Sequence, residues 1–317
     1  MSEMFYEGGA PSYSAICTLF NVPFKKELKE VDFAIEGFPF EAGSVNRAET
    51  RYAPSVIRNH ASFKGGLGYS EVLDVDADEF LTGTDLGEAP ILFGYKIPSL
   101  RIIQEETKKI VDADTMLIGL GGGQLVTLAE LRAMKEKYGP VALIHLAAER
   151  SCLDKEEKYD DSTAVIRAVE EGLIDPASSI QLGIRGGYES KEECEFGKDK
   201  GMTVLTASAM YDMTEEEVLA KIEEVVGEKP VFVSLDMSFL DPVYAPGVET
   251  PVVGGFSTHY LAKLLRGIAI KQAVKGIDVV NLTPAYDAGK VAAQASSSLI
   301  KSFLFGLAKK KQNGGTL

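Results

Sequence analysis

Short apolar runs alternate with helical patterns from about residue 90 onward, and this alternation limits the fold more than any other feature of the chain. A run that is apolar throughout is typical of a strand covered on both faces, as strands of parallel sheets are. The amphipathic segments between the runs predict crossover helices, so the pattern indicates a doubly wound α/β fold. The predicted strands are Phe33–Gly37, Thr115–Leu120, Val141–Ala147, Ser179–Ile184, Met202–Thr206, Val231–Asp236 and Ile277–Leu282.

Local signals give further boundaries. Thr214 with Glu217 has the spacing of a capping box, and Ser257 precedes a helix expected to run through Lys271. Residues 60–90 are rich in glycine and acids and predict an irregular excursion. With 317 residues and 45% hydrophobic content, we expect one domain over 1–317, with an N-terminal arm at 1–30 and a solvated tail at 309–317.

Composition excludes several classes of partner. The net charge of −14 is spread along the chain, which argues against nucleic acid or an anionic membrane surface as partner. The three cysteines Cys17, Cys152 and Cys194 are too few and too scattered for a disulfide framework. We see neither a charged-then-apolar leader nor an apolar run near the roughly 20 residues that span a bilayer. These features predict a cytoplasmic protein.

Unusual residues follow four of the predicted strands. In an open parallel sheet, ligands bind beyond the carboxyl ends of the strands, so these residues are the candidates for function. The four segments are 121–124, 147–151, 234–242 and 281–287. We expect them to line one site.

These segments resemble the arginase and agmatinase family, the manganese- or nickel-dependent ureohydrolases that cleave guanidino groups. The longest matching signature runs from Ser234 to Asp241 and Pro242 and on to Gly254 and Gly255. Supporting matches are Gly37–Phe40, Arg47, Arg51, Pro54, Ile57, Arg58, Arg167–Gly172, Gly183–Arg185 and Pro284–Asp287. The resemblance implies a three-layer arginase-like fold, with a mainly parallel central sheet and helices on both faces.

The family's metal-ligand positions are mostly altered in this chain. The resemblance places six residues at those positions, namely Gln124, Ala147, Glu149, Ser151, Asp236 and Ser238. Only Glu149 and Asp236 remain anionic, and the Gln124 amide is a poor substitute for an imidazole on a transition metal. Small neutral replacements also relieve the repulsion that carboxylates without cations would suffer. The resemblance therefore implies that the dinuclear site has been lost.

Two further positions have changed in the same sense. Asn281 stands where the family has its substrate-guanidinium glutamate, and Asp161 where it has a proton-shuttling histidine. We therefore expect a non-catalytic subunit without catalytic residues or a cofactor of its own. It would assemble, in a trimer- or hexamer-type hetero-oligomer, with an active paralogous ureohydrolase subunit carrying Ni or Mn. Metformin hydrolase is a heteromeric member of this kind, which pairs an active chain with a chain whose site is degenerate. This chain resembles the degenerate one.

Three alternatives stay open. The first is a metal-free small-ligand-binding or regulatory homo-oligomer that uses the same pocket. The second is a divergent active hydrolase with a mononuclear metal site of His145, Glu149 and Asp236, because His145 shares strand parity with Glu149. The third is a dinucleotide site at Gly119 and Gly121, which lacks the third glycine of that fingerprint. Asp241 and Asp287 are expected only to hold turns.

Overall fold

The central element is one eight-stranded sheet with the strand order β4-β1-β5-β10-β9-β6-β7-β8, in a computed structural model that describes residues 16–61, 66–186 and 190–317. All neighbouring strands in this sheet pair in parallel. The strands are β1 (Phe33–Gly37), β4 (Gly83–Glu88), β5 (Met116–Leu120), β6 (Ala142–Leu146), β7 (Ile180–Ile184), β8 (Thr203–Thr206), β9 (Pro230–Asp236) and β10 (Ala273–Val280). A separate antiparallel pair is formed by β2 (Tyr69–Ser70) and β3 (Val75–Asp76).

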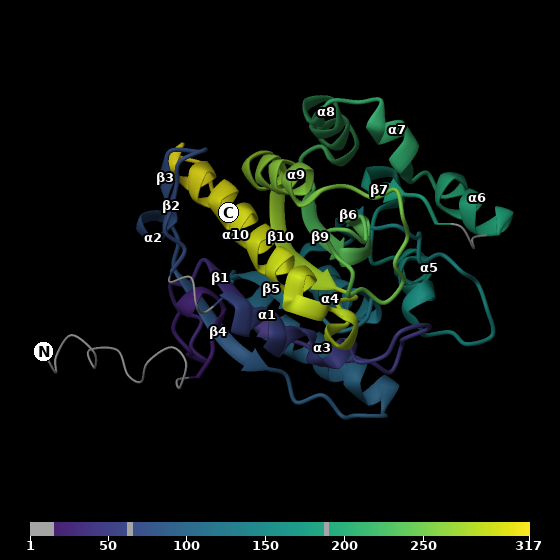
Figure 1. Ribbon diagram of the computed structural model, residues 1–317, viewed down its shortest axis with the longest axis horizontal. Helices are drawn as coiled ribbons and strands as arrows, with labels where there is room; N and C mark the ends of the chain where they lie inside the picture. Colours follow the sequence, from purple (N-terminus) through teal and green to yellow (C-terminus); the bar gives the residue numbers. More distant parts are fainter. Residues whose placement is uncertain (1–15, 62–65, 187–189) are drawn as a thin grey trace, which may run out of the picture.

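Helices cover both faces of the sheet, which makes three layers (Figure 1). The helices are α1 (Ala53–Ala61), α2 (Ala77–Phe80), α3 (Lys96–Asp112), α4 (Leu125–Tyr138), α5 (Ala164–Glu170), α6 (Lys191–Asp199), α7 (Ala207–Tyr211), α8 (Glu215–Val226), α9 (Thr258–Lys271) and α10 (Val291–Gln312). Side chains of α1, α8, α9 and α10 belong to one hydrophobic core, and those of α3, α4 and α5 to the other. The expected three-layer α/β fold is confirmed.

Successive side chains along each strand point alternately into these two hydrophobic cores. In β1, Phe33 and Ile35 join the α10 side while Ala34 joins the α3 side, because successive side chains point to opposite faces. All seven predicted strands are present. The Thr214 capping box and the Ser257 N-cap are formed as expected.

The expectation for residues 60–90 was wrong at its end. Residues 83–88 form the edge strand β4, which pairs with β1. The segment escaped prediction because two glycines and two acids hide its strand character. Buried Asp85 is paired with Arg58 at 2.9 Å and accepts hydrogen bonds from the N–H groups of Leu19 and Gly87, both at 2.9 Å. The antiparallel pair β2–β3 and the short helix α2 precede it.

The C-terminal helix also extends further than predicted. Helix α10 continues to Gln312, so the first four residues of the predicted tail at 309–317 are helical. The segment Ala288–Gln312 is long and apolar enough to cross a membrane, but 67% of its apolar window is buried inside the protein. It is therefore a helix of the protein core. Half of the predicted arm at 1–30, residues 1–15, lies outside the described residues.

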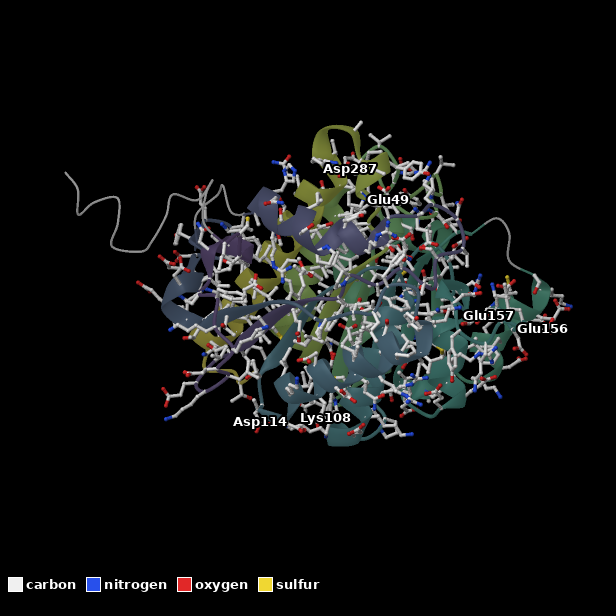
Figure 2. The ribbon with its side chains drawn as sticks, turned by 90° about the horizontal axis from the view of Figure 1, so that it is seen from below. Glu49, Lys108, Asp114, Glu156, Glu157 and Asp287 are labelled. Atoms are coloured by element: carbon white, nitrogen blue, oxygen red, sulfur yellow. The ribbon has the colours of Figure 1, made fainter. Side chains whose placement is uncertain are left out.

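Many charged side chains lie at the periphery of the molecule. Figure 2 shows Lys108 and Asp114 on one side and Glu156 and Glu157 on another, far from Asp287. Many are balanced locally, as in the pair of Lys108 with Glu136 at 3.0 Å. These charged side chains thus belong to solvated faces of the molecule.

Candidate functional site

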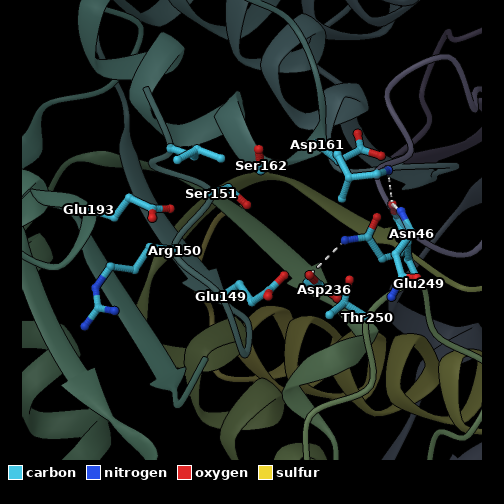
Figure 3. A pocket seen from close by; sticks show the side chains of 13 residues that line it. Asn46, Glu149, Arg150, Ser151, Asp161, Ser162, Glu193, Asp236, Glu249 and Thr250 are labelled. Carbon is cyan, nitrogen blue, oxygen red and sulfur yellow. Dashed lines mark hydrogen bonds between the residues drawn. The ribbon is translucent and has the colours of Figure 1, made fainter. Parts of the chain in front are cut away.

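A cavity of about 370 Å³ opens beyond the carboxyl ends of β6, β9 and β10. Because the strands are parallel, these ends meet at one edge of the sheet, where ligands bind in such folds. The lining residues are Val45, Asn46, Glu149, Arg150, Ser151, Leu153, Asp161, Ser162, Glu193, Asp236, Glu249, Thr250 and Asn281. Figure 3 shows Arg150 and Glu193 on one side and Asn46, Asp161 and Glu249 on the other, with Glu149 and Asp236 between them. Five of the predicted site residues, Glu149, Ser151, Asp161, Asp236 and Asn281, are therefore brought together.

Asp236 is held at the floor of this cavity. It is the last residue of β9, and its Oδ1 accepts a hydrogen bond from the Ser238 backbone N–H at 2.7 Å. Its Oδ2 accepts one from Asn281 Nδ2 at 2.8 Å, the contact drawn in Figure 3. Burial raises the pKa of Asp236, and these hydrogen bonds oppose the rise. Asn281 thus anchors a carboxylate of the protein.

Asp161 and Glu249 form a second acidic feature. Asp161 Oδ1 accepts a hydrogen bond from the Leu125 backbone N–H at 2.7 Å. Glu249 Oε1 accepts from the N–H groups of Val45 and Asn46 at 2.6 and 3.3 Å. The two carboxyl groups lie within hydrogen-bonding reach of each other. Burial raises the pKa of Asp161 to about 7, while burial and then repulsion from Asp161 raise that of Glu249 to about 9.

The glycine at 123 makes room for Asp161. A Cβ at Gly123 would stand 2.1 Å from Asp161 Oδ2, and one at Gly43 would stand 2.7 Å from Asp161 Oδ1. The absence of a side chain at Gly123 therefore leaves the space that the Asp161 carboxyl group occupies. Sequence reasoning treated the two positions separately and missed Glu249, although an acid between Val248 and Thr250 inside the long signature was the available signal.

Three predicted positions lie outside the cavity lining. Gln124 is fully buried, and its Nε2 donates to Thr127 Oγ1 at 2.9 Å and to Ser234 Oγ at 3.0 Å. Ala147 is buried, and Ser238 Oγ accepts from the Ala148 N–H at 3.2 Å. These side chains face the packed interior because hydrogen-bond partners or apolar neighbours are available there.

His145 also faces the interior. It is fully buried in β6, with Nδ1 3.1 Å from Gln181 Nε2, and burial lowers its pKa to about 4. The structure therefore does not bring His145 together with Glu149 and Asp236 in the cavity, because the histidine lies deeper in the strand than the two acids.

The aspartates expected to hold turns do so. Asp241 Oδ2 accepts from the N–H groups of Gly254 and Gly255 at 2.8 and 3.0 Å. Asp287 accepts from the N–H groups of Ala292 and Ala293 in the first turn of α10, both at 3.0 Å. Both roles are structural.

Comparison with known proteins decides the family. A sequence model described as the Arginase family matches residues 31–306. The chain belongs to the arginase family. It is 34% identical to an agmatinase of Cronobacter sakazakii over 282 residues, 89% of either chain. Its structure is similar to the proclavaminate amidino hydrolase of Streptomyces clavuligerus, with a TM-score of 0.88, 27% identity, and coverage of 95% of this chain and 100% of that one.

These relatives contradict the expectation of a non-catalytic subunit. The chain belongs to the arginase family and is 34% identical to an agmatinase over 89% of its length, so its relatives give no support for a non-catalytic role. The altered ligand positions are only part of the cavity, because Asp161 and Glu249 bring two other carboxyl groups into it. The match to the Arginase family over residues 31–306 also argues against the dinucleotide site at Gly119 and Gly121.

The expectation that this chain has no cofactor of its own is contradicted as well. A formiminoglutamase of Trypanosoma cruzi, described with Mn²⁺, shares the arginase fold with a TM-score of 0.83, 19% identity, and coverage of 92% of this chain and 97% of that one. Because the chain belongs to the arginase family, there is no longer a reason to expect that it has no metal of its own.

The donors present in this chain do not fit the family's pair of metal ions. Within the described residues, no group of three or more histidine, cysteine, aspartate or glutamate side chains could hold a metal ion. Glu149 and Asp236 are the two carboxylates left at the family's ligand positions, and catalytic metal sites usually have three protein ligands. We therefore derive no step of the reaction through a metal.

Proposed function

We propose that this chain is a divergent ureohydrolase, which hydrolyses a C–N bond of a small guanidino or amidino compound in the cavity beside Asp236. The observation that carries the proposal is an acid-lined cavity at the strand ends of an arginase-family domain. Its volume of about 370 Å³ lies in the range of small-molecule sites.

The charge of the cavity supports a cationic substrate. Five acids, Glu149, Asp161, Glu193, Asp236 and Glu249, line it together with a single arginine, Arg150. Even with protons on some of these acids the cavity is anionic, and a partly enclosed anionic cavity concentrates cations. Guanidinium and amidinium groups are cations that donate several hydrogen bonds to carboxylates.

Proton transfer can also be assigned to this chain's own side chains. A group that exchanges protons at neutral pH should have a pKa near 7, and Asp161 meets this condition. The ring of His145, with its lowered pKa and interior position, does not. Asp161 is therefore our candidate for general acid–base work.

The test is release of urea, substituted urea or ammonia by the purified chain. The panel contains agmatine, other guanidino and amidino compounds, and metformin as a substituted guanidine, each assayed with chelator and with added Mn²⁺ or Ni²⁺. Asp236→Asn and Glu149→Gln should each lower the rate at least about 10²-fold, because each removes a charge that faces the substrate. Glu156→Gln, on the exposed surface, should not change it. No product under any condition, or full activity in both site variants, would refute the proposal.

We also propose three general properties of this protein. They are a single ureohydrolase-like domain over 1–317, a cytoplasmic location, and assembly with a paralogous ureohydrolase chain. Native mass spectrometry of the complex taken from its own cells tests the last: a second ureohydrolase mass supports it, and a single repeated mass argues against it.

A further inference from the structure

Asp161 and Glu249 join three separate segments at one wall of the cavity. Glu249 holds the turn at Val45 and Asn46 through two backbone N–H groups, and its own N–H donates to the Asn281 carbonyl at 2.9 Å. Asp161, at the start of the short helix Asp161–Thr163, holds the first residue of α4, Leu125. The side-chain contact between the two acids is therefore a link between these segments.

This contact lacks a donor. Asp161 and Glu249 are 4% and 2% exposed, and their inner oxygens, Oδ2 and Oε2, are buried without a hydrogen-bond partner. Two ionised carboxylates in hydrogen-bonding reach would offer acceptors only and would repel each other. One proton placed between them supplies the missing donor and removes half of the charge.

The surroundings do not provide a cation instead. In the part of the chain that the structure describes, neither acid forms an ion pair with lysine or arginine. The charged groups that act on Asp161 besides Glu249 are Asp160 and Asp236, both acids, and Asp160 is itself paired with Lys155. Arg150, Glu149 and Glu193 line other parts of the cavity (Figure 3). Repulsion across the pair is therefore relieved by a proton.

We propose that Glu249 is a positioning residue, which shares a single proton with Asp161 and thereby holds the Val45–Asn46 turn against the start of helix α4 at the wall of the cavity. The inference goes beyond the proposed function, because the link exists whatever reaction the cavity catalyses. When the proton is lost, the two carboxylates repel each other and the turn is released.

A fluorescent reporter can follow this turn without any activity assay. The chain contains no tryptophan, and Val45 is 49% exposed, so Val45→Trp introduces a single tryptophan at the turn with little disturbance of packing. Its fluorescence anisotropy should be high from pH 6 to 8 and should fall around pH 9, where the raised pKa of Glu249 places the loss of the last, shared proton.

Three substitutions in that background separate a shared proton from a merely structural role. Glu249→Gln keeps the acceptor for Val45 and supplies an N–H donor to Asp161, so the anisotropy should stay high from pH 6 to 10. Glu249→Ala removes the link, so it should be low throughout. Asp161→Asn supplies the donor from the other side and should behave as Glu249→Gln does.

A matched control exists in the second buried carboxyl pair, Glu130 with Asp278, whose members are fully buried and which contacts neither Val45 nor Asn46. Glu130→Gln should leave the anisotropy transition where it is in the parent. The proposal is overturned if the parent shows no transition between pH 6 and 10, or if Glu249→Gln shows the same transition. A chain that hydrolyses none of the tested compounds can still pass this test, so the two proposals fail separately.

Discussion

At the scale of single residues, the fit of Asp161 against Gly123 predicts a measurable coupling. Gly123→Ala places a Cβ about where Asp161 Oδ2 lies, 2.1 Å away, so it should lower the free energy of unfolding by about 1–3 kcal/mol. In an Asp161→Ala background the same change should cost far less, because the obstructing carboxyl group is gone. Urea denaturation of the four chains measures the coupling, and additive costs would contradict the packing argument.

Asn281 gives a second prediction at this scale. Its φ of +65° is left-handed, and its side chain supplies a donor to buried Asp236. Asn281→Gly should cost about 1–3 kcal/mol, since Asp236 Oδ2 loses its partner. Asn281→Ala should cost about 1–2 kcal/mol more, because alanine also disfavours this φ. Chemical denaturation measures both, and equal costs would show that the backbone conformation changes in the variants.

At the scale of elements, Asp287 fixes the start of α10. Its carboxylate accepts from the N–H groups of Ala292 and Ala293, which have no partners within the helix. Asp287→Ala should therefore lower the free energy of unfolding by about 0.5–2 kcal/mol. Asp287→Asn, which keeps one acceptor oxygen, should lose less. Thermal unfolding followed by circular dichroism measures the order, and a reversed order would exclude the capping role.

Elements differ in how far their own sequence specifies them. Strands β5, β6 and β9 are apolar runs, and they form within one residue of the predicted bounds because burial on both faces selects such sequences. Strand β4 carries Asp85 and two glycines, and it is a strand because Arg58, from helix α1, neutralises Asp85 at the sheet edge. Arg58 lies 27 residues from Asp85 in the sequence, so no local sequence pattern could predict this strand.

At the scale of the whole molecule, buried acids predict that stability falls as pH rises. Burial raises the pKa of Asp278 to about 6, Asp161 to about 7, Glu36 to about 8 and Glu249 to about 9. Their stabilisation is complete below the unfolded pKa values near 4 and is lost as pH passes through each folded value. His145 acts in the opposite sense below pH 6.5, because its folded pKa is about 4. Four acids outweigh one histidine in this range, so urea midpoints should decline from about pH 5 to pH 9.

A variant series checks the cause of this decline. Glu36→Gln removes one raised carboxyl group, so the fall in urea midpoint between pH 5 and 8 should become shallower. Glu216→Gln, on the exposed side of α8, should leave it unchanged. A midpoint that rises from pH 6 to 9 in the parent would contradict the assignment of protonated buried acids.

The sequence predicted the position of the site in the fold but only some of the residues that line it. Parallel strands bring their carboxyl ends together, so Glu149, Asp236 and Asn281 were expected at one edge and are found there. Gln124 and Ser238 were assigned to the same edge, yet their side chains turn to interior partners. A sequence position fixes which strand end a residue follows, but the direction of its side chain depends on donors supplied by other elements.

The amino-acid sequence by itself determined the three-layer α/β fold, its strands and the edge of the sheet that carries the cavity, because hydrophobic periodicity is local and the carboxyl ends of parallel strands share one edge. Only the tertiary structure decided that Asp161 and Glu249 meet, that Gly123 makes room for them, and that His145 stays out of the cavity. Those facts depend on distances between segments up to two hundred residues apart, such as Val45 and Glu249, and such distances exist only once the chain has folded.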